Sequence, residues 1–191
     1  MTANIYRLLI RYREFENEIW RTIDISENST LAKLAYTIIG SFNCNATHSY
    51  AFNVFGNMYY FYSESEDNIY PECIKLKELS INCSSEFFMI YDFGCDQFFD
   101  IKVIDKFELE KGTGTQYPKI VDGAGHGIID DMFKNELRSE LKKKKKNKNY
   151  AITYYNFNDE LVEYDINDFS IEEANKILKR RLPKISFAYS S

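Results

Sequence analysis

Apolar and polar residues alternate at the start of the chain, which is the pattern of a strand with one buried face. In residues 4–13 three arginines alternate with an apolar set: Tyr6, Leu8, Ile10 and Tyr12. Residues 18–25 repeat the period with three isoleucines: Ile19, Ile23 and Ile25. Short polar residues separate the two runs, so this part of the chain predicts a hairpin.

The spacing of apolar residues then changes to that of an amphipathic helix over residues 29–42, which Ser29 or Thr30 would cap. The apolar positions recur at intervals of three and four residues: Leu31, Leu34, Ala35, Ile38, Ile39 and Phe42. Residues 49–62 return to strand character on both sides of a Gly-Asn turn pair. A helix followed by a second hairpin is therefore expected.

Strand and turn patterns continue through the middle of the chain. Residues 63–68 are acidic and predict a solvated loop, and residues 74–80 predict a short helical turn. Residues 86–94 and 97–109 alternate again and predict two strands joined by a turn. The residues expected on their apolar faces are Phe87, Met89, Tyr91, Phe93, Phe99, Ile101, Val103, Phe107 and Leu109.

The last third of the chain predicts two helices with a strand between them. Residues 128–146 have helical spacing at five apolar positions: Ile129, Met132, Phe133, Leu137 and Leu141. Residues 151–157 are typical of a strand. Residues 168–182 predict a helix with Ser170 as its N-cap and Glu173 at the capping-box position. The stripe expected to be buried on this helix is Ile171, Ala174, Ile177 and Leu178.

The order strand, strand, helix, strand, strand predicts an α+β fold. We expect a mostly antiparallel sheet with a β-grasp-like ββαβ start, one helix lying across it, and further helices at the C-terminus. Residues 1–133 are expected to form the main domain. Residues 134–191 would add a basic helix and a C-terminal strand and helix that pack on the same domain.

Composition fits one globular domain, because the 191 residues are 45% hydrophobic and 28% charged. No stretch approaches the roughly 20 apolar residues that span a bilayer. The N-terminus lacks the features of a signal peptide, and none of the four cysteines forms a CxxC pair. We therefore expect a cytoplasmic protein with reduced cysteines and no membrane contact.

Charge is distributed unevenly along the chain. The segment 134–148 holds eight basic and two acidic residues, which leaves a net charge of −11 on the rest of a chain whose total is −5. The acidic body favours a basic partner, whereas the basic patch is suited to contact phosphate groups.

The segment YPKIVDGAGHGIIDD, residues 117–131, concentrates the candidate chemistry. Asp122, His126, Asp130 and Asp131 are candidate ligands for a divalent metal ion, because carboxylate oxygens suit Mg²⁺. A phosphate cradle at a helix N-terminus is a second interpretation, but two aspartates in the first helical turn would oppose it. We favour a structural turn that leads into a helix, which requires no cofactor.

Two further positions carry possible ligands. His48, at the start of a strand, is more typical of a structural histidine than of a ligand. The run Tyr91 to Gly94, YDFG, has no kinase glycine-rich strand or catalytic loop with it. It predicts a strand end in which Asp92 accepts hydrogen bonds and Gly94 provides a positive φ.

A run of lysines is the other candidate site. The residues that would contact nucleic acid are Lys142, Lys143, Lys144, Lys145, Lys146 and Lys148. Each would contribute a phosphate contact, and such binding weakens steeply with salt. The alternative is a solvated helix end whose cations suit the negative end of the helix dipole.

Four stretches together resemble the plasmid pRiA4b ORF-3-like family, whose members include insertion-element passenger proteins. They are EIWRTIDISENSTLAKLAYTIIGSF, HSYAF, YDFG and YPKIVDGAGHGIIDD, in that order along residues 4–133. The resemblance implies the α+β fold and a mobile-element setting, and it implies no established reaction.

The chain departs from this family's pattern at several polar positions. The family's DFGD-x-W-x-H run has Cys95 for its second aspartate, Gln97 for its tryptophan and Phe99 for its histidine. Ile120 and Gly127 stand where many members have cysteines. A metal site built from those histidines and cysteines would therefore be missing here.

Two functions from different classes follow from these patterns. The first is a phage or plasmid accessory protein that binds a host protein without catalysis, for example an inhibitor of a defence nuclease of the anti-CRISPR kind. The alternative is a metal-dependent, nucleic-acid-associated enzyme, or a DNA- or RNA-binding accessory factor, that uses the acidic loop 122–131 and the lysine run 142–148. The chain has no G-x-S-x-G nucleophile elbow, so the sequence gives no support to catalysis by a serine nucleophile.

Overall fold

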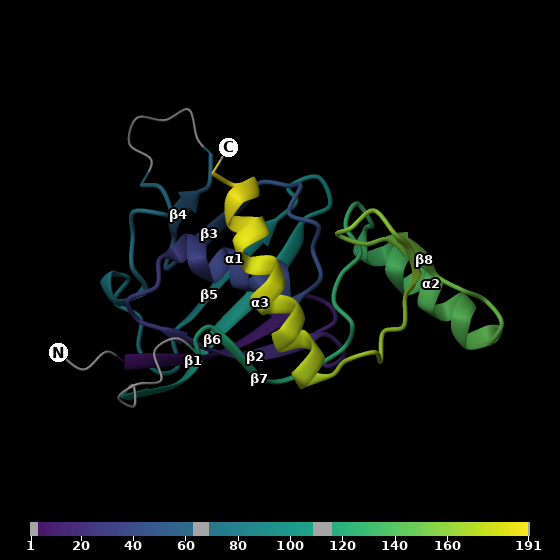
Figure 1. The fold of residues 1–191 in the computed structure, drawn as a ribbon, viewed down its shortest axis with the longest axis horizontal. Coiled ribbons are helices and arrows are strands. Elements are labelled where there is room, and N and C mark those ends of the chain that lie inside the picture. The colour runs from purple at the N-terminus through teal and green to yellow at the C-terminus, as the bar shows by residue number, and fades with distance from the viewer. Residues whose placement is uncertain (1–3, 63–68, 109–115, 191) are drawn as a thin grey trace.

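A seven-stranded sheet forms the centre of the computed structural model, which describes residues 4–62, 69–108 and 116–190 (Figure 1). Its strands are β1 (Asn4–Tyr12), β2 (Trp20–Ser26), β3 (Tyr50–Val54), β4 (Asn57–Tyr60), β5 (Glu86–Tyr91), β6 (Gln97–Glu108) and β7 (Lys119–Ala124). They lie in the order β4-β3-β5-β6-β1-β2-β7, and every neighbouring pair is antiparallel. The predicted α+β class with an antiparallel sheet is confirmed.

A bulge in the pairing of β1 with β6 changes which side chains of β6 face the core. Leu8 pairs with Val103, but Arg7 pairs with Asp105, so one residue of β6 is passed over. After the bulge Phe107 points to the opposite face from Val103, and the Arg7 guanidinium lies 5.2 Å from its ring centre. The predicted shared face of Val103 and Phe107 is therefore wrong, because a β-bulge reverses the alternation.

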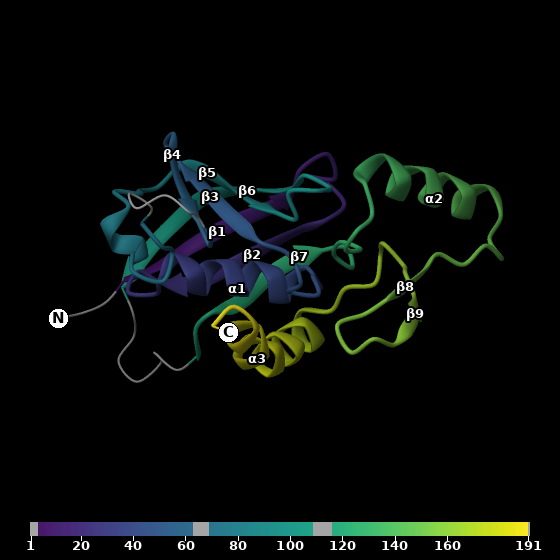
Figure 2. The same cartoon turned by 90° about the horizontal axis from the view of Figure 1, so that it is seen from above.

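Helix α1 (Leu31–Ser41) crosses one face of the sheet, as predicted (Figure 2). The Thr30 hydroxyl caps it by accepting a hydrogen bond from the Lys33 amide at 3.1 Å. Most of its residues are buried, because its second face is covered by helix α3 (Ile171–Ala188). The short turn predicted over 74–80 is the 3₁₀ helix η1 (Leu76–Glu78).

Helix α3 begins where the sequence predicts, but it buries a different stripe. The Ser170 hydroxyl accepts from the Glu173 amide at 3.5 Å, so Ser170 is the N-cap. Of the predicted stripe only Leu178 is fully buried, and Ile171 is 40% exposed. The helix runs six residues past 182, and its buried residues are Leu178, Arg181, Leu182 and Ile185. The C-terminal half of α3 makes the contact with α1. The residues at the start of α3 do not reach α1.

Helix α2 (Lys134–Lys146) and the hairpin β8 (Thr153–Tyr155) with β9 (Leu161–Glu163) lie together at one end of the sheet (Figures 1 and 2). The helix predicted from residue 128 starts six residues later. Asp131 has a φ of 61°, which a right-handed helix excludes, and Ile128 and Ile129 are buried instead of lining a helix.

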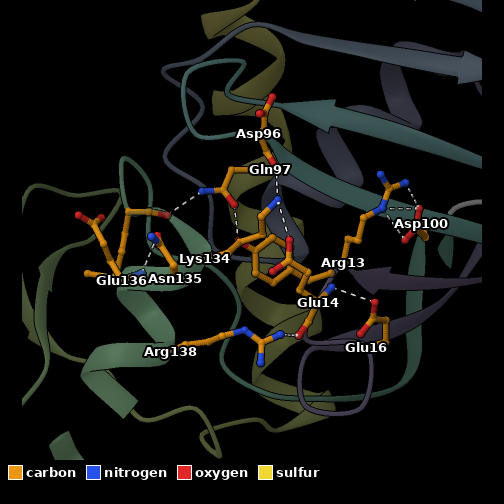
Figure 3. Close-up of polar contacts among 12 residues, drawn as sticks. Arg13, Glu14, Glu16, Asp96, Gln97, Asp100, Lys134, Asn135, Glu136 and Arg138 are labelled. Carbon is orange, nitrogen blue, oxygen red and sulfur yellow. Dashed lines mark hydrogen bonds and ion pairs between the residues drawn. The ribbon is translucent and has the colours of Figure 1, made fainter. Parts of the chain in front are cut away.

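The first turn of α2 is held against two turns of the sheet (Figure 3). Lys134 Nζ donates to the Asp96 carbonyl at 2.7 Å and lies 3.5 Å from the Glu14 carboxylate. Arg138 donates to the Glu14 carbonyl. Gln97, fully buried, donates to the Met132 carbonyl at 2.9 Å. These bonds fix the segment just before α2, which carries Asp130 and Asp131.

Two predictions fall on residues outside the described ranges: the acidic loop 63–68 and the position of Leu109. None of the helices in the described part of the chain is long and apolar enough to cross a lipid bilayer.

Candidate functional site

The glycine-rich loop, residues 123–131, is held tightly between the β1–β2 hairpin and the end of α1. Gly125 and Gly127 have φ values of 77° and 126°, and a Cβ on either would lie 2.2 Å from a backbone oxygen. Those oxygens are the carbonyls of Glu18 and Phe42. Only glycine permits both the backbone conformation and this close approach.

A buried arginine holds the first half of this loop. Arg21 is 1% exposed and donates to the Gly125 carbonyl at 2.7 Å and to the His126 carbonyl at 3.3 Å. Its partners are carbonyl groups, and burial lowers the pKa of Arg21 to about 9. Arg21 is not recognisable as a site residue from the sequence, because an arginine on a strand is ordinarily a solvent-facing residue.

Two of the loop's amides donate to protein carbonyls. His126 N donates to the Ile166 carbonyl at 3.1 Å, and Ile128 N donates to the Phe42 carbonyl at 2.9 Å. Because α2 begins only at Lys134, the loop does not lie at a helix N-terminus. The favoured interpretation, a turn leading directly into a helix with both aspartates in its first turn, is therefore wrong in its second part.

The four predicted metal ligands are not brought together. Asp122 lies on β7, where its carboxylate accepts from the Gly123 amide at 2.8 Å. His126 faces Tyr154, whereas Asp130 and Asp131 lie on the other side of the loop, beside His48.

One of the predicted ligands, Asp131, converges instead with two residues outside the predicted set. One potential ligand atom from each of His48, Asp92 and Asp131 lies within 4.8 Å of the other two, and we call this group the His48 cluster. His48 Nε2 is 3.2 Å from Asp131 Oδ1, and His48 Nδ1 is 3.7 Å from Asp92 Oδ1. His48 and Asp92 meet because Tyr50 of β3 pairs with Tyr91 of β5.

The His48 cluster contains polar atoms that lack protein partners. Asp92 is 4% exposed, and its Oδ2 has no hydrogen-bond partner among the described residues. The same holds for His48 Nε2, despite its proximity to Asp131. A buried carboxylate oxygen without a donor is costly, and a cation is one of the few ligands that remove the cost.

The turn that carries Asp92 corrects two details of the prediction. Asp92 Oδ1 accepts from the amides of Gly94 at 3.0 Å and Cys95 at 3.3 Å, as expected. The positive φ belongs to Asp92 itself, at 54°, and not to Gly94. The strand ends at Tyr91, so Phe93 leaves the predicted apolar face and is 45% exposed. Asp131 also has a positive φ, so two of the three cluster residues have uncommon backbone conformations.

Asp130 lies next to the cluster and is held in one orientation. Its Oδ2 accepts from the Tyr91 hydroxyl at 2.7 Å and from the Asn45 amide at 2.9 Å. Its Oδ1 is buried without a hydrogen-bond partner among the described residues. Burial raises the pKa of Asp130. An oriented carboxylate with a raised pKa and a free oxygen has the properties of a general base.

One member of the cluster, Asp131, lines a recess of about 310 Å³ beside β8. Asp130, Asn45, Met132 and Tyr155 also line this recess. Asp131 is the exposed member of the cluster, with 78% of its side chain accessible. A ligand in the recess would therefore contact Asp131.

Cys95 lies beside the cluster as a protonated thiol. Burial, followed by the charge of Asp92, raises the pKa of Cys95 to about 11. A thiol is a weaker ligand than a thiolate, so Cys95 would join a metal site only where the ion displaces its proton.

Comparison with known proteins identifies the family. The model of the plasmid pRiA4b ORF-3-like proteins matches residues 4–173. The chain belongs to this family. A crystal structure titled as a protein of unknown function, MM3350, from Methanosarcina mazei Go1 is similar to the chain, with a TM-score of 0.73 and 18% identity. The match covers 91% of this chain and 97% of that one, and it shows a shared fold. No curated protein matches the chain.

The family match extends past the resembling motifs and includes α2 and the β8–β9 hairpin. That hairpin provides the residue that His126 contacts: its Nε2 lies 2.6 Å from the Tyr154 hydroxyl. His126 Nδ1 is 3.6 Å from the Asp168 carboxylate. Burial lowers the pKa of His126 despite this carboxylate, so the imidazole is neutral at pH 7.

The lysine run forms the last turns of α2, and some of its charges are paired. Lys143 Nζ is 2.6 Å from the Glu140 carboxylate, and Lys144 Nζ is 2.8 Å from that of Glu163. The remaining lysines of the run are exposed: Lys142, Lys145, Lys146 and Lys148. Contact with nucleic acid through these lysines stays a prediction.

Proposed function

We propose that this protein is a metal-dependent phosphodiesterase whose divalent ion is held by His48, Asp92 and Asp131. The convergence of one imidazole and two carboxylates around partnerless buried atoms carries the proposal. This function is the metal-dependent alternative of the sequence analysis with a different ligand set. Mixed nitrogen and oxygen ligands suit Mn²⁺ or Zn²⁺.

His48, Asp92 and Asp131 would hold the ion, and a divalent ion there would supply an activated water as the nucleophile for cleavage of a phosphodiester. Asp130, with its free Oδ1, would accept the proton of that water and pass it to the leaving oxygen as the phosphorus–oxygen bond breaks.

The three aspartates Asp92, Asp130 and Asp131 would repel an anion on their own, and a divalent ion would offset most of their negative charge. One feature supports a phosphodiester substrate. Helix α2 starts beside the recess, since Glu136 lines it, and its last turns carry the lysine run. A nucleic acid strand bound to these lysines would be kept close to the ion.

Metal binding is the first test. Isothermal titration of the chelator-treated protein with MnCl₂ or ZnCl₂ should show one site. His48→Asn and Asp92→Asn should each weaken binding about tenfold or more, because each removes a ligand. Asp122→Asn is the matched control, since Asp122 is a carboxylate on β7 outside the cluster. Equal metal affinities of the Asp92→Asn and Asp122→Asn variants would show that Asp92 is not a ligand and would refute the proposed site.

Hydrolysis is the second test and is independent of the first. Bis(4-nitrophenyl) phosphate should be cleaved with Mn²⁺ present and left intact with EDTA. His48→Asn should abolish turnover, and Asp122→Asn should retain it. A protein that binds one Mn²⁺ at the cluster but cleaves neither this diester nor single-stranded DNA would be a metal-binding protein without the proposed activity.

Docking to a host protein is a second candidate, and an exposed aromatic patch favours it. Phe55, Tyr62 and Phe93 are 56%, 69% and 45% exposed around the edge strand β4. The Tyr60 and Phe93 rings lie 6.5 Å apart within the patch. Exposed aromatic side chains gathered at one edge are typical of protein-binding surfaces.

An inhibitor of a defence nuclease would use such a patch. Affinity capture from host lysate should recover a protein with the wild type that is lost with the double variant Phe55→Ser, Phe93→Ser. The variant Leu161→Ser is the control, because Leu161 is 62% exposed on β9, at the other end of the molecule from β4 (Figure 2). Loss of the partner with the control variant, or its retention by the double variant, would argue against this surface.

A further inference from the structure

Three cations of α3 line a pocket of about 320 Å³ between α3 and the β8–β9 hairpin. We call it the basic pocket, and its lining includes His126, Tyr154, Phe157, Arg180, Arg181 and Lys184. We propose that the basic pocket binds one nucleotide, with its phosphate against Arg180 and Lys184 and its base against the aromatic wall. The proposal goes beyond the metal site and does not require it.

The charges of the pocket favour a phosphate. Arg180 and Lys184 are exposed, lie four residues apart on α3, and form no ion pair with any carboxylate of the described residues. The lining also holds two carboxylates: Glu163, which is paired with Lys144 at 2.8 Å, and Asp168, which lies 3.6 Å from His126 Nδ1. Two cations one helical turn apart form a site for a phosphate group within an acidic protein.

The third cation has a structural role. Arg181 is 6% exposed, and it donates to the carbonyls of Gly40 and Cys44 at the end of α1. Its guanidinium lies 4.3 Å from the centre of the Phe157 ring, and Lys184 Nζ lies 6.0 Å from the same centre. Arg181 therefore holds Phe157 against the turn of α3 that carries Arg180 and Lys184. It adds positive potential to the basic pocket without contacting the nucleotide.

The rest of the lining suits an aromatic base. Phe157 and Tyr154 provide ring surfaces, and Asn43 and Asn158 belong to the same lining, with the Asn43 amide nitrogen donating to the His126 carbonyl at 2.6 Å. Aromatic surfaces stack on bases of any sequence, and amides bond to base edges. A volume of about 320 Å³ is at the lower end of the range for ligand pockets, which fits one nucleotide and excludes a duplex.

The floor of the pocket is preformed. His126 Nε2 is 2.6 Å from the Tyr154 hydroxyl, and the His126 ring is packed at steep angles against those of Tyr154 and Tyr164. Arg21 fixes the backbone on which His126 stands. A floor that is held in place before binding loses little entropy when a ligand enters.

The test is isothermal titration of the full chain in EDTA, so that the metal site is silent. The ligands are 5′-AMP, adenosine, inorganic phosphate and a ten-residue oligoadenylate. We expect 5′-AMP to bind at least about tenfold more tightly than adenosine or phosphate alone, since a charge-assisted contact and a stacked base both contribute. Equal affinities for phosphate and 5′-AMP, or no binding of either nucleotide ligand, would overturn the proposal.

Variants locate the binding. The double variant Arg180→Gln, Lys184→Gln should bind 5′-AMP about tenfold or more weakly, because two phosphate contacts are lost. The double variant Lys176→Gln, Lys179→Gln removes the same charge from the same helix outside the basic pocket and should bind as the wild type does. Equal loss in both pairs would mean a general charge effect and would refute the site. Tighter binding of oligoadenylate than of 5′-AMP would identify a nucleotide within a strand, and the reverse would identify a free nucleotide.

Discussion

The two histidines of the chain lie on opposite sides of one loop, and their surroundings differ in kind. His126 is part of the glycine-rich loop and has its Nε2 beside the Tyr154 hydroxyl. His48 faces the far end of the same loop, between the carboxylates of Asp92 and Asp131, and its Nε2 has no hydrogen-bond partner among the described residues. The first environment is satisfied by protein groups, whereas the second holds polar atoms without a partner among the described residues, which is why we propose a cation there.

This difference changes how the glycine-rich loop that contains His126 is interpreted. A histidine in a glycine-rich, acidic segment suggests a ligand, but here it forms the floor of a pocket. The aspartates at the end of the segment are the ones that reach a histidine, and that histidine lies on the connection to β3. Position in the fold, and not proximity in the sequence, decides which histidine can bind a metal.

The largest expected effect comes from breaking the loop that separates the two regions. Gly127→Ala should destabilise the protein by more than about 3 kcal/mol, because the Cβ would meet the Phe42 carbonyl carbon and oxygen at a φ of 126°. Chemical denaturation measures the loss. Gly56→Ala is the control: its φ is 89°, nothing lies within 4 Å of the added Cβ, and the cost should be only about 1–2 kcal/mol. Similar costs for the two variants would mean that the loop is not tightly held.

The next largest effect distinguishes a catalytic role of Asp130, beside the His48 cluster, from a structural role. Asp130→Asn should lower Mn²⁺-dependent diesterase turnover about 100-fold or more, because an amide cannot accept the proton from the bound water. Folding stability should be kept, since an amide oxygen still accepts from Tyr91 and Asn45. Burial raises the pKa of Asp130, so the ionised carboxylate is unfavourable in the folded state at pH 7, and the neutral amide avoids this cost.

Paired titration and denaturation experiments check this prediction. A variant that loses both stability and activity would make Asp130 a structural anchor of the loop. A variant that is as stable and as active as the wild type would refute its role as the base.

Two hydroxyl deletions compare the regions directly. Tyr91→Phe removes a hydrogen bond to the Asp130 carboxylate and should cost about 2 kcal/mol, since bonds to charged groups are the stronger class. Tyr154→Phe removes the bond to the neutral His126 and should cost about 1 kcal/mol. Urea denaturation of the two variants gives the ranking. The opposite order would mean that the His126 side carries the stronger polar contact.

The sequence predicts the periodic parts of this fold and misses the features that depend on pairing. The strands of the β1–β2 hairpin and helix α1 follow from apolar spacing alone. The bulge beside Arg7 does not follow from apolar spacing, because it arises from the pairing of β1 with β6. It places Phe107 on the other face of the sheet. The late start of α2 was also not predicted from the sequence, because the burial of Ile128 and Ile129 outweighs their helical spacing.

The same limit applies to the site. His48, Asp92 and Asp131 are remote in the sequence, and β3–β5 pairing and the loop after β7 bring them together. Their residue types were visible, but their proximity was not. Arg180 and Lys184 belong to the basic run KRRLPK, residues 179–184. Their place in one pocket with Phe157 requires the hairpin to fold back on α3.

The smallest expected effect is a pH dependence that distinguishes the two histidines. Burial lowers the pKa of His126 in the folded state, against the opposing charges of Asp168 and Asp165, and Arg21 lowers it further. The unfolded chain therefore takes up the proton first, so stability is fully present above about pH 6.5 and is lost as the pH falls through the lower folded value. Thermal denaturation of the chelator-treated protein at pH 7.5 and 5.5 should show this loss in the wild type and in His48→Gln, and a smaller loss in His126→Gln. Equal losses in all three proteins would show that the buried imidazole is not the group that responds.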